Sequence, residues 1–280
     1  MDVRQVIDKI AQNAERNAKG RKEHLNSFDG LLHCDICGDA VQTRVELFGE
    51  IKTVRCICQC DKARLAAEKA QAEQAELARR IQRLRADGFD RAEMEHLTFD
   101  TDDHKQPQLS RAMRAYADGF DDFKAVGKGL LLYGSVGSGK TFAAACVANA
   151  LIDKGIPVLM TTFSRIINRI QASFEGRQEY IDDITAYPLL IIDDLAAERN
   201  TEFVNEIVFS VIDARYRIGL PLIVTTNIDH ETMIQETDTA RRRIYSRIIE
   251  RCHPIRVSGA DRRAKAAVAD FAEMQKRLGL

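Results

Sequence analysis

Short runs of apolar residues alternate with longer amphipathic stretches from residue 130 onward. The short runs are rich in Leu, Ile and Val, as expected of buried strands. The longer stretches carry apolar positions three or four residues apart, which is typical of helices packed on a sheet. The predicted strands cover Leu130–Tyr133, Pro157–Thr162, Leu189–Leu195, Leu220–Asn227 and Ile255–Val257, and the predicted helices cover Phe142–Ile152, Ser164–Phe174, Glu202–Arg217 and Thr239–Cys252. This alternation predicts an α/β domain in which helices cover both faces of a parallel sheet, a three-layer sandwich.

The pattern before residue 96 is less regular and indicates a separate N-terminal part. Residues 1–30 begin with helical spacing and then turn polar, which fits either a solvated arm or a docking helix for a partner. Residues 61–87 predict one long helix that ends at Gly88 and carries only a thin, alanine-rich apolar stripe. Such a stripe buries little, so we expect this helix to bridge two domains. A further amphipathic helix is predicted at 112–123. The expected division is 1–60, a linker at 61–95 and a main domain at 96–280.

Composition narrows the class of protein without identifying it. The chain has 280 residues, 45% hydrophobic and 30% charged, with a formal net charge of −1, so bulk charge does not attract it to nucleic acid. No apolar run approaches the about 20 residues that span a bilayer, and the N-terminal residues lack a signal-peptide core. We therefore expect a cytoplasmic protein, in which clustered cysteines indicate a metal site before disulfides.

The strongest chemical signal lies between the first predicted strand of the sheet and the helix that follows it. There the sequence matches the P-loop pattern GxxxxGK[ST], and the strand–loop–helix context is the one this pattern requires. Backbone N–H groups of such a loop converge on phosphates, and the helix N-terminus favours negative charge. The lysine should reach the β- and γ-phosphates, and the threonine hydroxyl should bind Mg²⁺. We expect ATP to bind here, at Gly134, Ser135, Val136, Gly137, Ser138, Gly139, Lys140 and Thr141.

Two neighbouring strands end in polar residues that suit the same nucleotide. Asp193 and Asp194 follow four apolar residues, the pattern of a Walker B element. Ending a buried strand in carboxylates is costly unless something compensates the charge, and Mg²⁺ bound to phosphates would do so. Asp193 is thus the expected Mg²⁺ ligand together with Thr141, and Asp194 the residue that orients the attacking water. Thr225-Thr-Asn227 ends the next strand, where its polar side chains would face the γ-phosphate or that water.

A row of arginines marks the last long helix. Arg243, Arg247 and Arg251 are four residues apart and therefore form a single file beside an apolar face. Only Glu250 lies nearby in the sequence to balance them, so we interpret the row as directed at an anion, either a neighbour's ATP or nucleic-acid phosphate. Arg262 and Arg263 follow the last strand, and one of them is expected to reach back to the phosphates.

Five cysteines near the N-terminus predict a metal centre. Two lie in a Cys-x-x-Cys-Gly knuckle and three in the segment CICQC, with an expected hairpin between them that turns at Gly49. Four thiolates satisfy tetrahedral Zn²⁺, and the spacing resembles a zinc ribbon. The preferred set is Cys34 and Cys37 with two of Cys56, Cys58 and Cys60, and His33 is a further candidate. The remaining cysteines, Cys146 and Cys252, are expected in the core.

These motifs together resemble the AAA+ ATPases of the DnaC/DnaI type, the replicative-helicase loaders. The similarity runs from about Leu97 to Arg263 and rests on LTF, GSVGSGKT, LLIIDDL, IVTTN, RIYSR and GADRR, preceded by the cysteine cluster. The resemblance implies that Asn227 is sensor 1, which contacts the γ-phosphate, and that Arg247 is the arginine finger that completes a neighbour's ATP site. It places sensor 2 at Arg262 or Arg263.

The same resemblance implies a function. It predicts ATP-dependent loading of a DnaB-type helicase onto single-stranded DNA, with docking through the zinc-containing N-terminal domain and self-association through the AAA+ domain. Single-stranded DNA would contact the helical insert at Arg165, Arg169, Phe174 and Arg177, where cations and an aromatic ring suit phosphates and stacked bases. Asp194 stands where the wider family usually has glutamate, so its reach to water is shorter and hydrolysis is expected to be slow.

Other functions fit part of the same sequence. An IstB-like transposition helper shares the ATPase core but would not be expected to carry a cysteine-rich N-terminal domain. A DnaA-like initiator is disfavoured because only 17 residues follow Arg263. A small-molecule kinase is disfavoured because no lid or acceptor pocket is evident. A protein of another class, a nucleotide-regulated adaptor that works through its zinc domain, remains an alternative.

Overall fold

The computed structural model describes residues 22–47, 49–172, 176–198, 201–259, 271 and 274–278. The chain divides into two compact units, residues 1–78 and 79–280, which are described separately. The predicted N-terminal arm or docking helix falls largely on residues 1–21, outside the described residues. Within the described residues, no helix is both long and apolar enough to cross a membrane.

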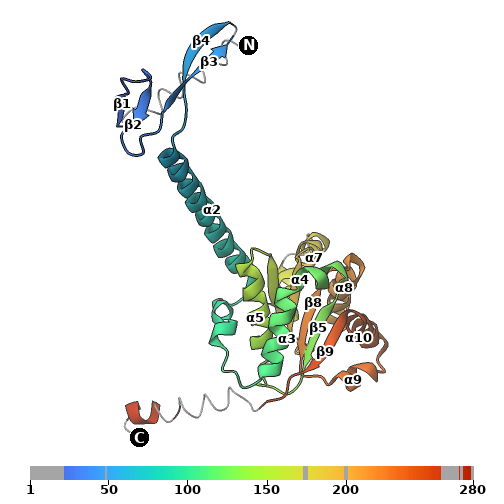
Figure 1. Cartoon of the computed structure of the whole chain (residues 1–280). Helices are drawn as coiled ribbons and strands as arrows, with labels where there is room; N and C mark the ends of the chain where they lie inside the picture. Colours follow the sequence, from blue (N-terminus) through green and yellow to red (C-terminus); the bar gives the residue numbers. More distant parts are fainter. Residues whose placement is uncertain are drawn as a thin grey trace. The chain divides into compact units, whose positions relative to one another are not determined.

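The first unit contains two small antiparallel sheets (Figure 1). Strands β1 (Glu23–Leu25) and β2 (Leu32–Cys34) form one, and β3 (Gln42–Leu47) and β4 (Glu50–Arg55) form the other. Gly49 has φ of 79°, a left-handed conformation that glycine adopts without strain, and this confirms the predicted hairpin turn. Among the described residues of this unit, Cys34, Val41 and Cys58 form the buried core.

Helix α2 (Gln59–Gly88) confirms the predicted long helix. The division between the two units falls within it, after Ala78. Its last turns belong to the second unit, where Ile81 and Leu84 pack against the hydrophobic core. Gly88 ends the helix where a Cβ atom would come within 2.6 Å of the Val158 carbonyl oxygen, so the close packing there requires glycine.

The second unit is built on a five-stranded parallel sheet in the order β6-β7-β8-β5-β9. The strands are β5 (Gly129–Tyr133), β6 (Val158–Thr162), β7 (Leu189–Leu195), β8 (Leu222–Thr226) and β9 (Cys252–Arg256). The helices are α3 (Pro107–Asp118), α4 (Phe120–Ala125), α5 (Lys140–Asp153), α6 (Phe163–Ala172), α7 (Arg177–Thr185), α8 (Glu202–Ile218), α9 (His230–Ile234) and α10 (Thr239–Arg251), with short 3₁₀ turns at Ala92–His96 and Phe99–Thr101. The predicted parallel α/β sheet is confirmed.

Helices cover both faces of the sheet, which explains why its strands read as continuous apolar runs. On one face Leu131, Leu190 and Val224 pack against α6, α7, α8 and α10. On the other face Leu132 and Ile191 pack against α3 and α5. Figure 1 shows the sheet between these two sets of helices. The carboxyl ends of the strands meet at one edge, and this edge carries the polar side chains considered below.

The structure differs from the predicted elements in three places. The amphipathic stretch at 112–123 is two helices, because the chain breaks at Gly119, whose N–H bonds to the Ala115 carbonyl. Helices α7 and α9 were not predicted, since α7 is rich in acidic residues and α9 has only five residues. Strand β9 begins at Cys252 rather than at residue 255, because it pairs with β5 from Gly129 onward.

Candidate nucleotide site and cysteine cluster

The P-loop has the predicted strand–loop–helix geometry. Strand β5 ends at Tyr133, and α5 begins at Lys140. Gly134 has φ of 147°, and a Cβ atom there would lie 2.2 Å from the Val257 carbonyl oxygen, so no other residue fits without moving the backbone. Gly139 is the left-handed N-cap of α5, with φ of 102°. These two glycines let the loop turn sharply into the helix, whose N-terminus then points at the space for phosphate.

Lys140 and Asn227 meet across the loop. The Lys140 ammonium group donates to Asn227 Oδ1 at 2.8 Å and to the carbonyl oxygens of Gly134 and Ser135 at 3.0 and 2.8 Å. Lys140 is only 5% exposed, which means that the loop surrounds the charge rather than leaving it in solvent. The predicted phosphate-binding lysine and the predicted sensor residue thus lie in direct contact, although 87 positions separate them.

Asp193 and Thr141 also meet, as expected of a Mg²⁺ site. The Thr141 hydroxyl donates to Asp193 Oδ1 and Oδ2 at 2.9 and 3.2 Å, and the Thr225 hydroxyl donates to Oδ1 at 2.6 Å. Burial raises the pKa of the Asp193 carboxyl above its usual range, and the two hydroxyl donors act in the opposite direction. A buried carboxylate beside a hydroxyl is a donor set that suits Mg²⁺, so these residues fit a metal bound with nucleotide phosphates.

Thr225 has a role that sequence reasoning missed. Besides its bond to Asp193, its oxygen accepts a 2.9 Å hydrogen bond from the Asp194 backbone N–H. Asp194 has φ of 56°, and the pairing of β7 with β8 shifts register between Ile192 and Leu195. The fully buried Thr225 hydroxyl therefore holds the irregular backbone on which both acidic residues stand. The sequence indicated this role only weakly. Thr225 is one of three polar residues, with Thr226 and Asn227, at the end of a predicted buried strand.

Two cavities flank the nucleotide edge. One, of about 250 Å³, reaches Asp193 and is lined by Arg91, Met160 and Arg165, among other residues. The second holds only about 20 Å³ and lies beside the start of α5, between Phe99, Leu109 and Phe142. The segment before α3 covers the P-loop here, because Gln106 Nε2 donates to the Ser138 carbonyl at 2.8 Å. Sequence reasoning did not find this covering segment.

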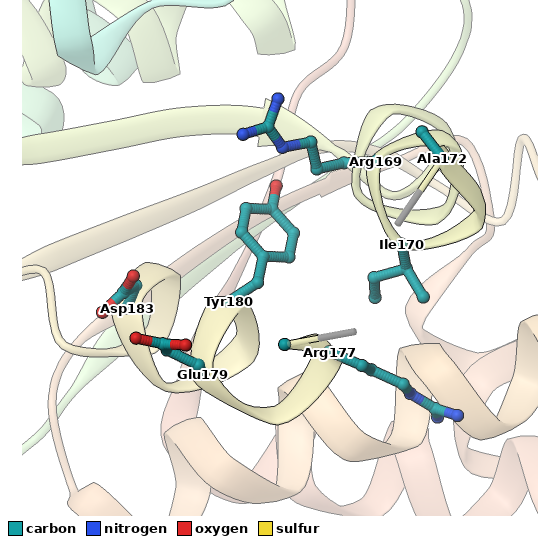
Figure 2. A pocket seen from close by; sticks show the side chains of 8 residues that line it. Arg169, Ile170, Ala172, Arg177, Glu179, Tyr180 and Asp183 are labelled. Atoms are coloured by element: carbon teal, nitrogen blue, oxygen red, sulfur yellow. The ribbon is translucent and has the colours of Figure 1, made fainter. Parts of the chain in front are cut away.

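The predicted DNA-contacting residues do not all come together. Arg165 is bound to Asp90, with Nη1 2.8 Å from its carbonyl oxygen and Nε 3.3 Å from its carboxylate. Arg169 and Arg177 both line a cavity of about 460 Å³ beside Tyr180. Figure 2 shows Arg169 next to the Tyr180 ring, whereas Arg177 points away, and Arg177 pairs with Glu206 at 3.0 Å. Phe174 lies outside the described residues.

The arginine file of α10 has partners on α8 that the sequence did not reveal. The expectation that only Glu250 balances the file is wrong, because Asp213 of α8 accepts a 2.8 Å hydrogen bond from Arg247. Asp213 lies 34 positions from Arg247 on another helix, so the spacing of charges along α10 does not indicate this pair. The guanidinium groups of Arg243 and Arg251 stack on aromatic rings of α8 instead. The two candidates for sensor 2, Arg262 and Arg263, lie outside the described residues.

Four cysteines gather in the first unit. The sulfur atoms of Cys34, Cys37, Cys58 and Cys60 all lie within 4.8 Å of one another. Cys60 Sγ is 3.4 Å from Cys34 Sγ and 3.2 Å from Cys58 Sγ. Backbone N–H groups of Cys37 and Ile36 lower the pKa of the Cys34 thiol to about 7, which favours the thiolate that a metal requires. Four thiols at these distances fit tetrahedral Zn²⁺, whose Zn–S bonds are about 2.3 Å long.

The other two candidate ligands point elsewhere. The thiol of Cys56 donates to the Ala40 carbonyl at 3.2 Å, outside the cluster. His33 uses both ring nitrogens, one 2.8 Å from the Gly38 carbonyl oxygen and the other 2.8 Å from Asp29 Oδ2. Of the five cysteines that the sequence offered, Cys56 is therefore the one that the fold separates from the rest.

Known proteins are similar to this chain over much of its sequence. The family model described as IstB-like ATP binding protein matches residues 64–269. The replicative helicase loader DnaI of Bacillus subtilis is 29% identical over 149 residues, 49% of this chain and 48% of its own. A putative insertion sequence ATP-binding protein of Sinorhizobium fredii is 32% identical over 170 residues, 59% of this chain and 55% of its own. The chain thus spans about half the length of these curated relatives.

Solved structures show the same fold. A crystal structure of DnaI is 25% identical, with a TM-score of 0.53, and the match covers 64% of this chain and 99% of that one. The DnaC helicase loader is 23% identical with a TM-score of 0.50, covering 60% of this chain and all of that one. The second unit therefore has the AAA+ P-loop fold that the sequence predicted. Because the family model spans most of the chain and the P-loop, Asp193 and Asn227 lie together as an ATP site requires, the chain belongs to the IstB-like ATP-binding protein family.

Proposed function

We propose that this protein is an ATP-dependent loader that delivers a DnaB-type replicative helicase to single-stranded DNA. The observation that carries the proposal is the combination of an ATP site with a four-cysteine unit on one chain. Relatives named as helicase loaders support it. In this proposal the first unit binds Zn²⁺ through Cys34, Cys37, Cys58 and Cys60 and docks on the helicase, while the second binds ATP and DNA.

Each residue of the ATP site has a role in this proposal. Lys140 leaves its contact with Asn227 to bind the phosphates, and Asn227 then faces the γ-phosphate and the attacking water. Thr141 and Asp193 would hold Mg²⁺, which would supply positive charge at the phosphates. Asp194 orients the water, and its short side chain makes hydrolysis slow. DNA or the helicase accelerates that step.

The first test is ATP hydrolysis by the purified chain, alone and with single-stranded DNA and a DnaB-type helicase. We expect a low basal rate that rises when both are present. Asp194→Asn should stop hydrolysis but keep ATP binding, because the P-loop is untouched. A loader with this substitution should hold the helicase without releasing it. An adaptor that works through its zinc unit would act normally with Asp194→Asn, and that outcome would contradict the loader proposal.

Docking is tested by co-purification of the helicase with the full chain. Cys58→Ser removes a clustered thiol and should abolish capture, whereas Cys56→Ser, two positions away, should leave capture intact. If neither the unsubstituted chain nor Cys56→Ser captures the helicase, the docking step is ruled out.

Contact with DNA is assigned to Arg169, which lines the cavity beside Tyr180, because Arg177 is already paired with Glu206. Arg169→Ala should weaken binding of a fluorescent single strand about tenfold, because one phosphate contact and its salt dependence are lost. Arg165→Ala should have a smaller effect, since Arg165 is already paired with Asp90. Equal losses for both variants would mean that Arg165 also contacts DNA.

A second function deserves the same assays. The similarity to a putative insertion sequence ATP-binding protein favours a transposition helper. Such a protein would be stimulated by double-stranded DNA and a transposase rather than by single strands and a helicase. The four-cysteine unit favours the loader, because a transposition helper would not be expected to carry it.

A further inference from the structure

One buried carboxylate links the arginine file of α10 to α8. Asp213 is 6% exposed and lies between two arginines. Its Oδ1 accepts a 2.8 Å hydrogen bond from Arg247 Nε and lies 2.8 Å from Nη2, and its Oδ2 accepts a 2.7 Å bond from Arg217 Nε. Burial alone would raise the pKa of this carboxyl, but the bonds from Arg217 and Arg247 hold it below its usual range. Asp213 is therefore ionised at neutral pH and fixed by two guanidinium groups.

Arg247 is held on three sides. Its guanidinium carbon lies 4.7 Å from the centre of the Phe209 ring and 5.6 Å from that of Tyr216, and Nη1 donates to the Arg243 carbonyl at 3.1 Å. A guanidinium group has five N–H donors. Three of these donors are in use. Nε and one N–H of Nη2 contact Asp213, and one N–H of Nη1 contacts the Arg243 carbonyl. The two that remain, one on each terminal nitrogen, have no partner among the residues that the structure describes.

An unused N–H on each terminal nitrogen, together called the free edge of Arg247, leaves the guanidinium group able to donate to phosphate oxygens. The charge around them favours such a ligand. Asp213 faces two guanidinium groups, and Arg243 and Arg251 add positive charge on either side, stacked on the rings of Phe209 and Tyr216. A second carboxylate, Glu250, accepts a 2.8 Å hydrogen bond from the Tyr216 hydroxyl, so four arginines face two carboxylates and the net charge here is positive. The side chain of Arg247 is only 25% exposed, so its direction is set by packing rather than by solvent.

We propose that Asp213 is the positioning residue for Arg247, holding its free edge ready for the γ-phosphate of ATP on a neighbouring copy of this chain. The inference rests on the proposed function, in which Arg247 acts across an interface between copies. It assigns a role to a residue that touches neither the nucleotide nor the P-loop. Without the carboxylate, Arg247 keeps its charge but can rotate away from the rings of α8.

The variant Asp213→Asn separates positioning from binding. The Asn side chain keeps the volume and loses the charge, so we expect kcat for ATP hydrolysis in the assembled protein to fall ten- to a hundredfold. The affinity for ATP of the subunit that carries the substitution should stay within twofold, because its own P-loop is unchanged. Asp213→Glu restores the charge and should recover part of the loss. A purely structural role would lower the folded fraction and not alter kcat per folded chain, which circular dichroism and active-site titration would reveal.

Mixing variants tests whether the effect acts across copies. Asp213→Asn subunits keep an intact P-loop, and Lys140→Ala subunits keep an intact Arg247 held by Asp213. Lys140→Ala alone should be inactive and Asp213→Asn alone should keep a tenth of the activity or less, whereas an equimolar mixture should be more active than either, because some mixed interfaces combine the two intact halves. No gain on mixing, with assembly confirmed by light scattering, would overturn the inference.

Two controls separate the inference from the function on which it rests. Glu206→Gln makes the same kind of change on α8, at an exposed residue that pairs with Arg177 rather than with α10, and should leave kcat unchanged. Arg247→Ala should lower kcat at least as much as Asp213→Asn. If Arg247→Ala has no effect, the proposed action across copies is wrong. If Arg247→Ala lowers kcat and Asp213→Asn does not, only the role of Asp213 is wrong.

Discussion

Thr225 shows how much one hydroxyl group organises in this ATP site. It donates to the carboxylate expected to hold Mg²⁺ and accepts from the backbone N–H of the next acidic residue. A threonine at the end of a strand would ordinarily be assigned to strand propensity alone. Here the hydroxyl fixes both the side chain of Asp193 and the backbone position of Asp194, so the two carboxylates keep a constant relative geometry.

Thr225→Val should therefore weaken the metal site while leaving the side-chain volume nearly unchanged. The substitution removes a hydrogen bond to Asp193 and leaves the Asp194 N–H unpaired. We expect the Mg²⁺ concentration for half-maximal ATP hydrolysis to rise about tenfold, as for other residues that hold a metal ligand. A Mg²⁺ titration measures this. Thr225→Ser keeps the hydroxyl and should stay within about twofold, and equal effects of both variants would argue against the role of the hydroxyl.

Arg215 of α8 is buried, and no carboxylate among the described residues pairs with it. It is 1% exposed, and its five N–H groups point at main-chain carbonyls of Thr185, Tyr187, Pro188 and Pro221. Burial lowers the pKa of its guanidinium group to about 9. Thr185 ends α7, and the other three residues lie in the loops that lead into β7 and β8, so Arg215 fixes the starting points of the two strands that carry Asp193 and Thr225.

Arg215→Lys should lower the free energy of unfolding by about 3 kcal/mol, because lysine has fewer donors and leaves buried carbonyls unpaired. Urea denaturation followed by circular dichroism measures the change. Arg111→Lys, on the exposed side of α3, should change it by less than about 0.5 kcal/mol. If Arg215→Lys lowers the free energy of unfolding as little as Arg111→Lys does, Arg215 does not fix the starts of β7 and β8.

Among the helices, α5 does more than present the P-loop. Its buried Asn149 donates to the carbonyls of Met94 and Leu97 at 2.9 and 3.0 Å and accepts from Arg85 at 2.6 Å. One amide side chain thus fastens the end of α2 and the segment after it to the helix that begins at Lys140. Both the donor and the acceptor group of the buried amide have partners, so the segment after α2 is held in one position against α5.

Asn149→Ala should release this segment. We expect a loss of about 2 kcal/mol in the free energy of unfolding, since buried carbonyls and Arg85 lose their partner. Hydrogen exchange of the amides around Met94–Leu97 should accelerate more than that of β7, because the sheet core does not depend on these bonds. The exposed Asn168→Ala serves as control and should change neither. Uniform acceleration over both regions would indicate general destabilisation instead.

On the scale of the whole molecule, the chain combines a small unit, whose described residues include few buried apolar side chains, with a larger unit that has an extensive core. Small units of this kind usually need a metal or disulfides for stability. We expect one Zn²⁺ per chain in the purified protein. Removal by a strong chelator should expose residues 22–58 to protease while the sheet of the second unit remains protected.

Matched cysteine variants test the metal prediction. Cys58→Ser should lower the zinc content to near zero and reproduce the protease sensitivity of the chelated protein. Cys56→Ser should retain zinc, because its thiol bonds to Ala40 rather than to the cluster. Zinc loss from both variants alike would show that Cys56 is a ligand and that the four-cysteine assignment is incorrect.

Much of this molecule could be predicted from the sequence by itself. The P-loop, the buried strands and the helices between them depend on spacing within short segments, because the geometry of a strand, a tight glycine turn or a helix is set by neighbouring residues. The predicted roles of Lys140, Thr141 and Asp193 rest on those patterns and on resemblance to known families, and the contacts that these residues make agree with them. Helix α9 was missed because five residues leave too weak a periodic signal.

Only the tertiary structure decided which side chains touch across elements. It separated Cys56 from the other four thiols, placed Thr225 between two acidic residues, and brought Asp213 to Arg247. These contacts depend on the register of strands and on which face of α8 meets α10. Residues far apart in the chain reach one another only when the core fixes those positions, and no local pattern records that outcome.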